Sequence, residues 1–592
     1  MRRNRLFIGV AATLFLCVAS ESLAQTPLDQ VPAQAPVVIH VRGHERTIGC
    51  IKKLAEAALG DLAAQATAGI DSGVSGILAG RELKALSPDA SLFIVMTSLP
   101  EEDEDPELAV VFKVTNYVQF RDGLLTDTEK KNLKANKNGY EDTTINEKPV
   151  FLLSRGEYAI VSFHEKAMKP FVEKKFESIA AKIGTPIRQK FLDNDLSVYV
   201  DAKQLNKQYG DKIAQFRQMF EQILQQAEMM SGLGKQMAAT KKVYAALFQM
   251  VEDSEQFVAG ASFEPDGLRL QAHTIVGEKS ASNKVFASGE SIKLSKLGVL
   301  PAGLMSYSSS AGGLELLKAV GMSMFGVGGP APTDDDDKNT EFSKALSELL
   351  ALKLEGWFGA IDYPQPGIQI VRYSDNAKAA ALSLKLYESI RENASLGGVP
   401  LKGKPIIQRD AAKANGFTFH HVQLAWDLAK FVEAFPEELR DVMKESLQKQ
   451  MGDEMKLWFG TDGKQLLQVN AKDWTAASKI VQDYVEGKAT LAKEAAFTSL
   501  QKKLPDEGSL LLLLNPAKMA LMIAQSAGAA LRGLPNAPPI GEPKIPDGPP
   551  SYIGLVAASQ AKNGTLDVWV SAAAIKTMVE VIKPVIPNLD PQ

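Results

Sequence analysis

The sequence contains little cysteine and little histidine. Its 592 residues include two cysteines, Cys17 and Cys50, and six histidines. Cys17 lies in an N-terminal segment that we expect to be removed, so the mature chain would keep a single cysteine. One cysteine excludes an internal disulfide, and the fold must therefore be stabilised by packing. We expect Cys50 to be free and buried.

Charge of neither sign is in excess, with 66 basic and 70 acidic residues and a formal net charge of −4. Nucleic-acid-binding proteins present a basic face, so this balance predicts no nucleic-acid partner. After the N-terminal segment the sequence also lacks an uninterrupted apolar run that could cross a bilayer. The best candidate, residues 509–531, is interrupted by Asn515, Pro516 and Lys518. We expect a buried strand followed by a helix there.

The first 24 residues have the pattern of a secretory signal peptide. Three arginines among the first five residues precede an apolar segment, residues 6–19, that is short for a membrane span. Ser22 and Ala24 are small residues at the positions that signal peptidase requires, which predicts cleavage between Ala24 and Gln25. The alternative is that the segment is kept as an anchor. The sequence thus predicts an exported protein, periplasmic or extracellular.

One pattern recurs along the chain: two apolar strands joined by a tight turn and followed by a helix. The turns contain pairs such as Asp462–Gly463 and Asn563–Gly564, in which glycine and asparagine tolerate the positive φ of hairpin turns. Ser374, Asp473 and Ser571 stand where the following helices need an N-cap. The hairpins are expected at residues 149–163, 257–276, 357–373, 455–471 and 551–570.

A second pattern is a short apolar strand that runs directly into a helix, and together the two patterns predict a duplicated chain. The strand-into-helix pattern begins near Pro32, Asn194, Pro301 and Pro505. After the signal peptide (1–24), we predict a first half, 25–298, and a second half, 299–592. The first has a long unit (31–188) and a short unit (189–288) with a helical hairpin (203–256); the second has a long unit (299–490) and a short unit (491–584).

The expected fold class follows from the hairpins. Turns of two to four residues can only return a chain antiparallel to itself. We therefore predict an α+β fold with mainly antiparallel sheets, built from repeated hairpin-plus-helix units whose helices pack mostly on one face. Residues 326–341 and 533–550, rich in glycine, proline or aspartate, are expected to be connections without regular structure.

Two features of the sequence carry a family resemblance. One is the motif VPAQ or LPAG, at residues 31–34 and 300–303, before an apolar strand. The other is the strand, hairpin and helix pattern of residues 139–172, GYEDTTINEKPVFLLSRGEYAIVSFHEKAMKPFV. In these the chain resembles an uncharacterised domain-of-unknown-function family of exported bacterial proteins. The resemblance implies export and repeated strand-hairpin-helix units, and it assigns no activity and no functional residue.

Residues 38–50, VIHVRGHERTIGC, are the densest group of metal-binding residue types. His44 and Glu45 begin the His-Glu-x-x-His pattern of zinc hydrolases, but Ile48 occupies the second histidine position and cannot bind a metal. The matching positions of the predicted repeats hold no ligand either. We therefore predict no metal, no cofactor and no catalytic residue. His40 and His44 are the candidates for a site unique to this segment.

The absence of a catalytic motif favours a non-enzymatic exported protein, a structural or binding component of the bacterial cell envelope or periplasm. Its partner would be a protein or a hydrophobic ligand. One alternative is a carrier that holds a hydrophobic ligand in a cleft between a sheet and its helices. A second alternative is a hydrolase whose site is assembled from distant residues, because catalytic groups need only be close in space.

Overall fold

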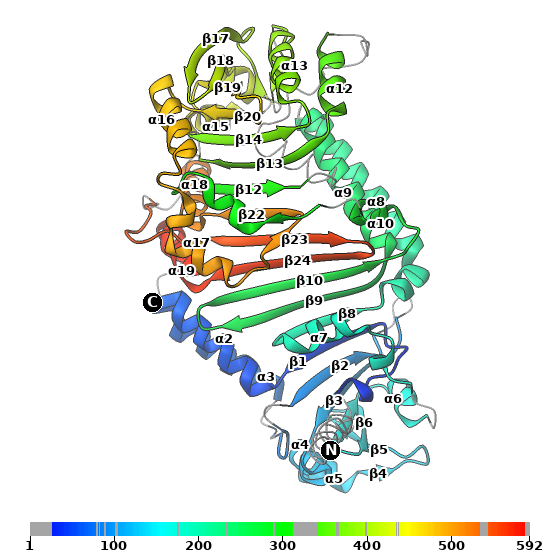
Figure 1. Ribbon diagram of the computed structural model, residues 1–592. Coiled ribbons are helices and arrows are strands. Elements are labelled where there is room, and N and C mark those ends of the chain that lie inside the picture. Colours follow the sequence, from blue (N-terminus) through cyan, green and yellow to red (C-terminus); the bar gives the residue numbers. More distant parts are fainter. Residues whose placement is uncertain are drawn as a thin grey trace, which may run out of the picture. The chain divides into compact units, whose positions relative to one another are not determined.

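The computed structural model describes residues 27–585 apart from 79–80, 82, 88–89, 101–104, 174–176, 232–233, 288–289, 312–340, 363–365, 393, 397–398, 434, 436 and 533–542 (Figure 1). The predicted signal peptide lies outside the described residues. So do most of the two connections predicted at 326–341 and 533–550.

The chain divides into two compact units. Unit 1 comprises residues up to 48 and 72–201, and unit 2 comprises residues 49–71 and 202 onward. Two of the three boundaries between them lie in helices α2 (His44–Leu59) and α3 (Ala63–Leu78), and the third lies between Asp201 and Ala202. Compact units need not coincide with repeated sequence units, because repeats can add strands to one shared sheet. The predicted duplication therefore stays a prediction.

Unit 1 is an antiparallel sheet with the strand order β8-β1-β2-β3-β7-β6-β5-β4. Its strands are β1 (Val37–Arg42), β2 (Ser91–Met96), β3 (Leu108–Lys113), β4 (Lys134–Ala135), β5 (Glu141–Ile145), β6 (Lys148–Arg155), β7 (Tyr158–Ser162) and β8 (Leu196–Val200). Its helices are α4 (Tyr117–Leu124), α5 (Asp127–Lys131), α6 (Glu165–Val172) and α7 (Thr185–Asp193), with short 3-10 helices η1 (Pro27–Gln30) and η3 (Ile179–Ala181).

Unit 2 contains a longer antiparallel sheet with the order β9-β10-β24-β23-β22-β12-β13-β14-β20-β19-β18-β17. These strands are β9 (Ser254–Glu264), β10 (Gly267–Val276), β12 (Ser306–Ser310), β13 (Leu354–Ile361), β14 (Gly367–Tyr373), β17 (Ile406–Ala414), β18 (Phe417–Ala425), β19 (Glu454–Thr461), β20 (Leu466–Asn470), β22 (Leu510–Leu514), β23 (Ile553–Gln560) and β24 (Asn563–Ser571). Two short pairs stand apart, β11 (Ile292–Lys293) with β21 (Glu507–Gly508) and β15 (Ser395–Leu396) with β16 (Val399–Pro400).

The helices of unit 2 connect these strands. They are α8 (Ala202–Ser231), α9 (Gly234–Asp253), α10 (Ala281–Ala287), α12 (Glu341–Ala351), α13 (Asn376–Glu388), α14 (Leu428–Val432), α15 (Glu437–Met451), α16 (Trp474–Val485), α17 (Ala495–Gln501), α18 (Pro516–Arg532) and α19 (Ala572–Ile582). Short 3-10 helices are η2 (Gly60–Leu62), η4 (Leu294–Val299), η5 (Leu491–Lys493) and η6 (Lys583–Val585). The prediction of an α+β fold with antiparallel sheets is confirmed.

Each predicted hairpin is present, as β6–β7, β9–β10, β13–β14, β19–β20 and β23–β24. Gly463 has the expected positive φ of 85° in the β19–β20 turn. The turn predicted at Asn563–Gly564 is wrong by two residues: Asn563 pairs with Gln560, and Lys562 takes the positive φ of 66°. Gly564 is required for another reason, because a Cβ there would lie 2.8 Å from Phe286 Cζ of α10.

Two of the three predicted N-caps are confirmed. Asp473 accepts a hydrogen bond from the backbone N–H of Ala476, and Ser571 accepts one from Ala574. The third was placed one residue early. Asp375, not Ser374, caps α13, and its Oδ1 accepts the N–H of Lys378 at 2.9 Å.

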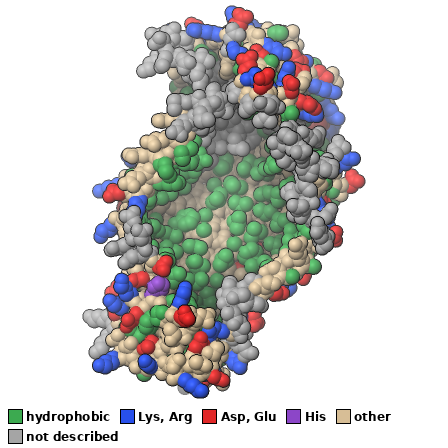
Figure 2. All heavy atoms as spheres, turned by 180° about the vertical axis from the view of Figure 1, so that it is seen from behind, with side chains coloured by type: hydrophobic (Ala, Val, Ile, Leu, Met, Phe, Trp, Pro, Cys, Tyr) green, Lys and Arg blue, Asp and Glu red, His purple; other side chains and the backbone are tan. Residues whose placement is uncertain are grey.

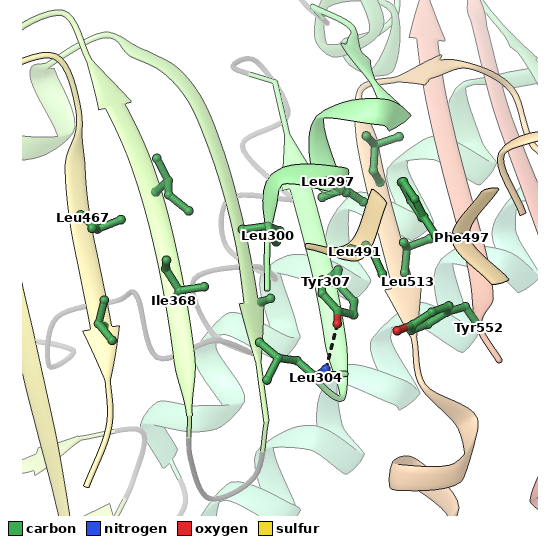
Figure 3. Packing of buried hydrophobic residues seen from close by; sticks show 14 of the residues in the cluster. Leu297, Leu300, Leu304, Tyr307, Ile368, Leu467, Leu491, Phe497, Leu513 and Tyr552 are labelled. Atoms are coloured by element: carbon green, nitrogen blue, oxygen red, sulfur yellow. Dashed lines mark hydrogen bonds between the residues drawn. The ribbon is translucent and has the colours of Figure 1, made fainter. Parts of the chain in front are cut away.

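The main core of unit 2 lies on one face of its sheet, which we call the covered face. Leu297 of η4, Leu491 of η5 and Phe497 of α17 pack there against strand residues such as Tyr307 and Leu513 (Figure 3). The phenol oxygen of Tyr307 accepts the backbone N–H of Leu304 at 2.8 Å, as drawn in Figure 3. These packed side chains are buried, so the core is continuous across the middle strands.

The opposite face is also packed at one end of the strand order. Trp357, Val371 and Phe459 lie in a second cluster with Ala380 and Leu384 of α13. Odd-numbered residues of β13, β14 and β19 thus face α13, whereas even-numbered ones face the main core. This alternation is the period of two that a strand imposes.

Loss of the observed cap should destabilise α13, because its backbone N–H of Lys378 would lose its acceptor. We expect Asp375→Ala to lower the free energy of unfolding by about 1 kcal/mol. Ser374→Ala, the matched control one residue earlier, should change it by far less. Urea unfolding followed by circular dichroism measures both, and an equal loss in the two variants would contradict the assignment of the cap.

Candidate ligand-binding face

Between β9 and β22 the second face of the unit 2 sheet is apolar and partly exposed, and we call it the open face. Val556, Trp569 and Leu511 point into the main core, so their neighbours along each strand point to the other side. Two rows of paired residues cross this side. They are Leu512, Leu555, Val568, Leu270 and Ala261, and next to them Leu510, Ala557, Leu566, Ala272 and Ala259.

The side chains of the open face are in contact with solvent. Leu270 is 41 % exposed and Leu566 is 36 % exposed, and the other residues of the two rows are partly exposed. Figure 2, which views the molecule from the side opposite to Figure 1, shows hydrophobic side chains gathered over the floor of a hollow in this face. Large contiguous apolar surfaces that are exposed often mark ligand-binding or interaction sites.

The usual polarity of a one-sided sheet is reversed on β10 and β24. Their covered side holds Arg269, Gln271 and Asp567, and Asp567 is only 3 % exposed. Its Oδ1 accepts a hydrogen bond from Arg269 Nη2 at 2.8 Å and another from Gln271 Nε2 at 2.6 Å. A sheet with one solvated face normally turns its apolar residues inward. Here Asp567 is buried, the Arg269 side chain that pairs with it is 33 % exposed, and Leu270 and Leu566 are on the solvent side.

Helices approach the open face at the two ends of its strands. At one end Leu54 and Ala58 of α2, with Ala572 of α19, pack against Phe263 and Leu268. At the other end Phe286 of α10 lies over Gly564. The middle of the strands, where Leu270 and Leu566 lie, is left exposed between them.

The hairpin of α8 and α9 adds further exposed apolar side chains in unit 2. Phe220 packs against Tyr244 with ring centroids 4.6 Å apart, which holds the two helices together. On the same helices Phe216 is 53 % exposed, Ile223 51 % and Val251 47 %. Apolar residues at a spacing of three and four normally face a core. The contact between α8 and α9 therefore covers only part of these apolar side chains.

His40, a candidate metal ligand, is instead a buried structural residue of unit 1. Its Nδ1 lies 3.0 Å from the carbonyl oxygen of Phe191, which can only accept, and its Nε2 lies 2.9 Å from Ser91 Oγ. The neutral ring therefore satisfies both contacts, with the proton on Nδ1. Burial lowers the pKa of His40 to about 4, and its ring stacks on Phe93 at 5.1 Å.

The second candidate, His44, is the first residue of α2, and its Nε2 lies 3.9 Å from Glu45 Oε1. Among the residues that the structure describes, no group of three histidine, cysteine, aspartate or glutamate side chains is arranged to hold a metal. Cys50 is free, but it is partly exposed and not buried as expected.

Comparisons with known proteins identify no relative: no family model, no curated protein and no solved structure matches the chain. Within the described ranges, no helix is long and apolar enough to cross a membrane. In residues 509–531 the predicted strand and helix are present as β22 and α18.

The sequence analysis did not locate the open face. Its signal is weak, because the five consecutive leucines of β22 show no alternation and predict only a buried strand. Leu511 and Leu513 are fully buried, but Leu510, Leu512 and Leu514 are partly exposed. A better signal is in β10, where leucines alternate with arginine, glutamine and histidine. Which of the two sides faces solvent is nevertheless decided by the other strands and helices.

The pKa of His40 predicts a loss of stability in mild acid. The folded protein keeps this ring neutral down to about pH 4, whereas the unfolded chain protonates it below the ordinary histidine pKa of 6.5. The contribution of the neutral His40 ring to the free energy of unfolding is complete above pH 6.5, and it is lost as the pH falls from 6.5 through 4. A pKa shift of this size corresponds to roughly 3 kcal/mol. We expect His40→Gln to remove this part of the pH dependence.

The measurement is the free energy of unfolding in urea at intervals between pH 7.5 and pH 4, for the wild type and for His40→Gln. His44→Gln is the control, since His44 lies close in sequence and its side chain is 32 % exposed. Carboxylates titrate alike in all three proteins and cancel in the comparison. Parallel curves for the wild type and His40→Gln would show that His40 does not drive the loss.

Proposed function

We propose that this chain is a non-enzymatic exported protein of the bacterial cell envelope or periplasm, and that it carries an apolar ligand on the open face of unit 2. The ligand class that fits is the hydrocarbon chain of a lipid. Export is supported by the basic and apolar pattern of the N-terminal residues and by the resemblance to exported bacterial proteins. The carrier hypothesis, one of the alternatives from the sequence, has the stronger support from the geometry.

The observation that carries this proposal is the reversed polarity of β10 and β24. Burying the exposed part of leucines such as Leu270 and Leu566 is favourable, at roughly 1.5–3 kcal/mol for a complete leucine side chain. The same strands place the Arg269–Asp567 pair on the covered side. Strands that bury Asp567 and leave Leu270 and Leu566 exposed are accounted for if an apolar partner covers these leucines.

The chemistry of the open face favours a hydrocarbon chain over a protein surface. Protein interfaces are enriched in tyrosine, tryptophan and arginine and form about ten hydrogen bonds. The two rows on the open face consist of leucine, valine and alanine alone. Such a surface offers no directional contact, and it suits a ligand that is bound by burial and dispersion.

The face is also extended enough for an acyl chain. From β9 to β22 it spans four gaps between neighbouring strands, which at ~4.8 Å each gives roughly 19 Å. A bilayer core ~30 Å thick holds two acyl chains end to end, or roughly 15 Å for each. One acyl chain of a membrane lipid can therefore lie across these strands.

The test is the binding of diphenylhexatriene, a hydrocarbon probe that fluoresces in apolar surroundings. We expect saturable binding to the wild-type chain and a loss of affinity of about tenfold or more in Leu270→Glu, because the carboxylate must be desolvated by the probe. Ile406→Glu is the matched control. Ile406 is an exposed strand residue of the same sheet, 57 % exposed, but it lies on β17 at the far end of the strand order.

Circular dichroism must show that both variants remain folded. Equal losses in Leu270→Glu and Ile406→Glu would remove the open face from consideration. Self-association of the wild type without probe binding, abolished by Leu270→Glu in sedimentation experiments, would assign the face to a second copy of the chain.

A further inference from the structure

The apolar pattern of the open face changes abruptly at β12, the strand next to β22. Tyr307 belongs to the main core, and Ser309 Oγ donates to the carbonyl oxygen of Trp357 at 3.0 Å. The alternate residues Ser306, Ser308 and Ser310 therefore share the side of the open face. Ser308 pairs with Leu512, so the serines directly continue the leucine rows. We call these three residues the serine row.

The hydroxyl groups of the serine row are in an unusual state. Ser306 is 3 % exposed and Ser308 is 2 % exposed, and among the residues that the structure describes neither Oγ atom has a hydrogen-bond partner. A buried hydroxyl without a partner has lost its hydration without replacement, and native proteins contain few of them. Two on one strand, at the end of an apolar surface, indicate a position where a polar group of a ligand completes the hydrogen bonds.

Strands β13 and β14 add a further polar side chain beside the serine row. On β13, Ser308 pairs with Gly359, which has no side chain, and Gly359 pairs in turn with Gln369 of β14. A Cβ at Gly359 would lie 3.1 Å from Gln369 Cγ, so the glutamine side chain extends over the glycine. Gln369 is 3 % exposed. Its amide thus lies on the same side as the serine row and in the same pairing line as Ser308.

The charge of the residues around the serine row indicates which classes of ligand could bind there. The residues that pair directly with the serine row are leucines on β22 and isoleucine, glycine and tryptophan on β13, without a lysine or arginine. A phosphate or carboxylate buried there would meet no counter-ion among these paired residues, and an unpaired buried charge is strongly unfavourable. Neutral hydroxyl and amide groups suit an ester, amide or alcohol.

We infer that the serine row, with Gln369, binds the uncharged polar end of an acyl lipid, such as its ester or amide linkage, while the hydrocarbon chain lies on the open face. This inference rests on the proposed carrier function. Ser306 and Ser308 donate hydrogen bonds to the ligand's carbonyl oxygen and accept from its hydroxyl or amide groups. Since water is largely excluded from the row, these hydrogen bonds are made without competition from bulk solvent.

The experiment compares two ligands, a monoacylglycerol and diphenylhexatriene, which has no polar end. We expect the double variant Ser306→Ala/Ser308→Ala to bind the monoacylglycerol about tenfold more weakly, as expected for the loss of two hydrogen bonds. Its affinity for diphenylhexatriene should stay within about twofold of the wild type. Ser309→Ala, on the same strand but facing the core, is the control and should keep the wild-type ratio of the two affinities.

A second measurement protects against a folding artefact. Because the two hydroxyls have no hydrogen-bond partner among the described residues, their removal should leave the melting temperature unchanged or raise it. Unchanged monoacylglycerol affinity in the double variant, with diphenylhexatriene still bound, would overturn the role of the serine row and leave the carrier function intact. Failure of the wild type to bind either ligand would overturn both proposals, and a lower melting temperature of the double variant would show that the hydroxyls are already bonded.

Discussion

The alternation of side chains along antiparallel strands is the constraint on which unit 2 depends. Each strand has two sides, and η4, η5, α16 and α17 supply a core for one of them. The other side is covered by α13, α14 and α15 over β13, β14, β20, β19 and β18, and by α2 and α19 at one end of β9 and β10. From β22 to β9 the fixed register brings Leu512, Leu555 and Leu270 into line. Between these helices the sheet presents an apolar surface.

The polar groups of the sheet are distributed in a way that a purely structural role does not require. The Arg269–Asp567 pair lies on the covered side, where charged groups must be paired to be tolerated. Ser306 and Ser308 lie on the opposite side, buried and, within the described part of the chain, without hydrogen-bond partners for their Oγ atoms. An apolar surface that ends in unpartnered hydroxyls has the same polarity as an acyl lipid, apolar along its length and polar at one end. This correspondence connects the proposed carrier function to the proposed ligand class.

In unit 1 a histidine, a residue type common in metal sites and active sites, has a structural role. Residues 38–50 contain histidines and a glutamate, which are common metal ligands. His40, however, lies on β1, which pairs with β2 on one side and β8 on the other. There the Phe191 carbonyl and Ser91 hydroxyl satisfy both ring nitrogens. The ring is held neutral by burial, so its main consequence is a dependence of stability on pH.

The sequence by itself determined the local structure of this protein. The hairpins, the helices that follow them, the caps at Asp473 and Ser571 and the antiparallel pairing all follow from turn residues and from periods of two and 3.6, which act over a few residues. The cap of α13 and the turn before Gly564 were misplaced by one or two residues, since neighbouring residues offered nearly equivalent chemistry. Whether the predicted halves share a common architecture is a separate property, and it stays a prediction.

Only the tertiary structure decided which side of each strand meets solvent. Leu270 and Arg269 are adjacent in sequence, and a strand with this pattern can turn either one inward. The choice is made by β24, which places Asp567 beside Arg269 although 298 residues separate them in the chain. In the same way, the buried serines of β12 come to lie beside the open face only through their pairing with β22, some 200 residues later. Such long-range pairing has no local signal, and for this reason the candidate site could not be predicted from the sequence.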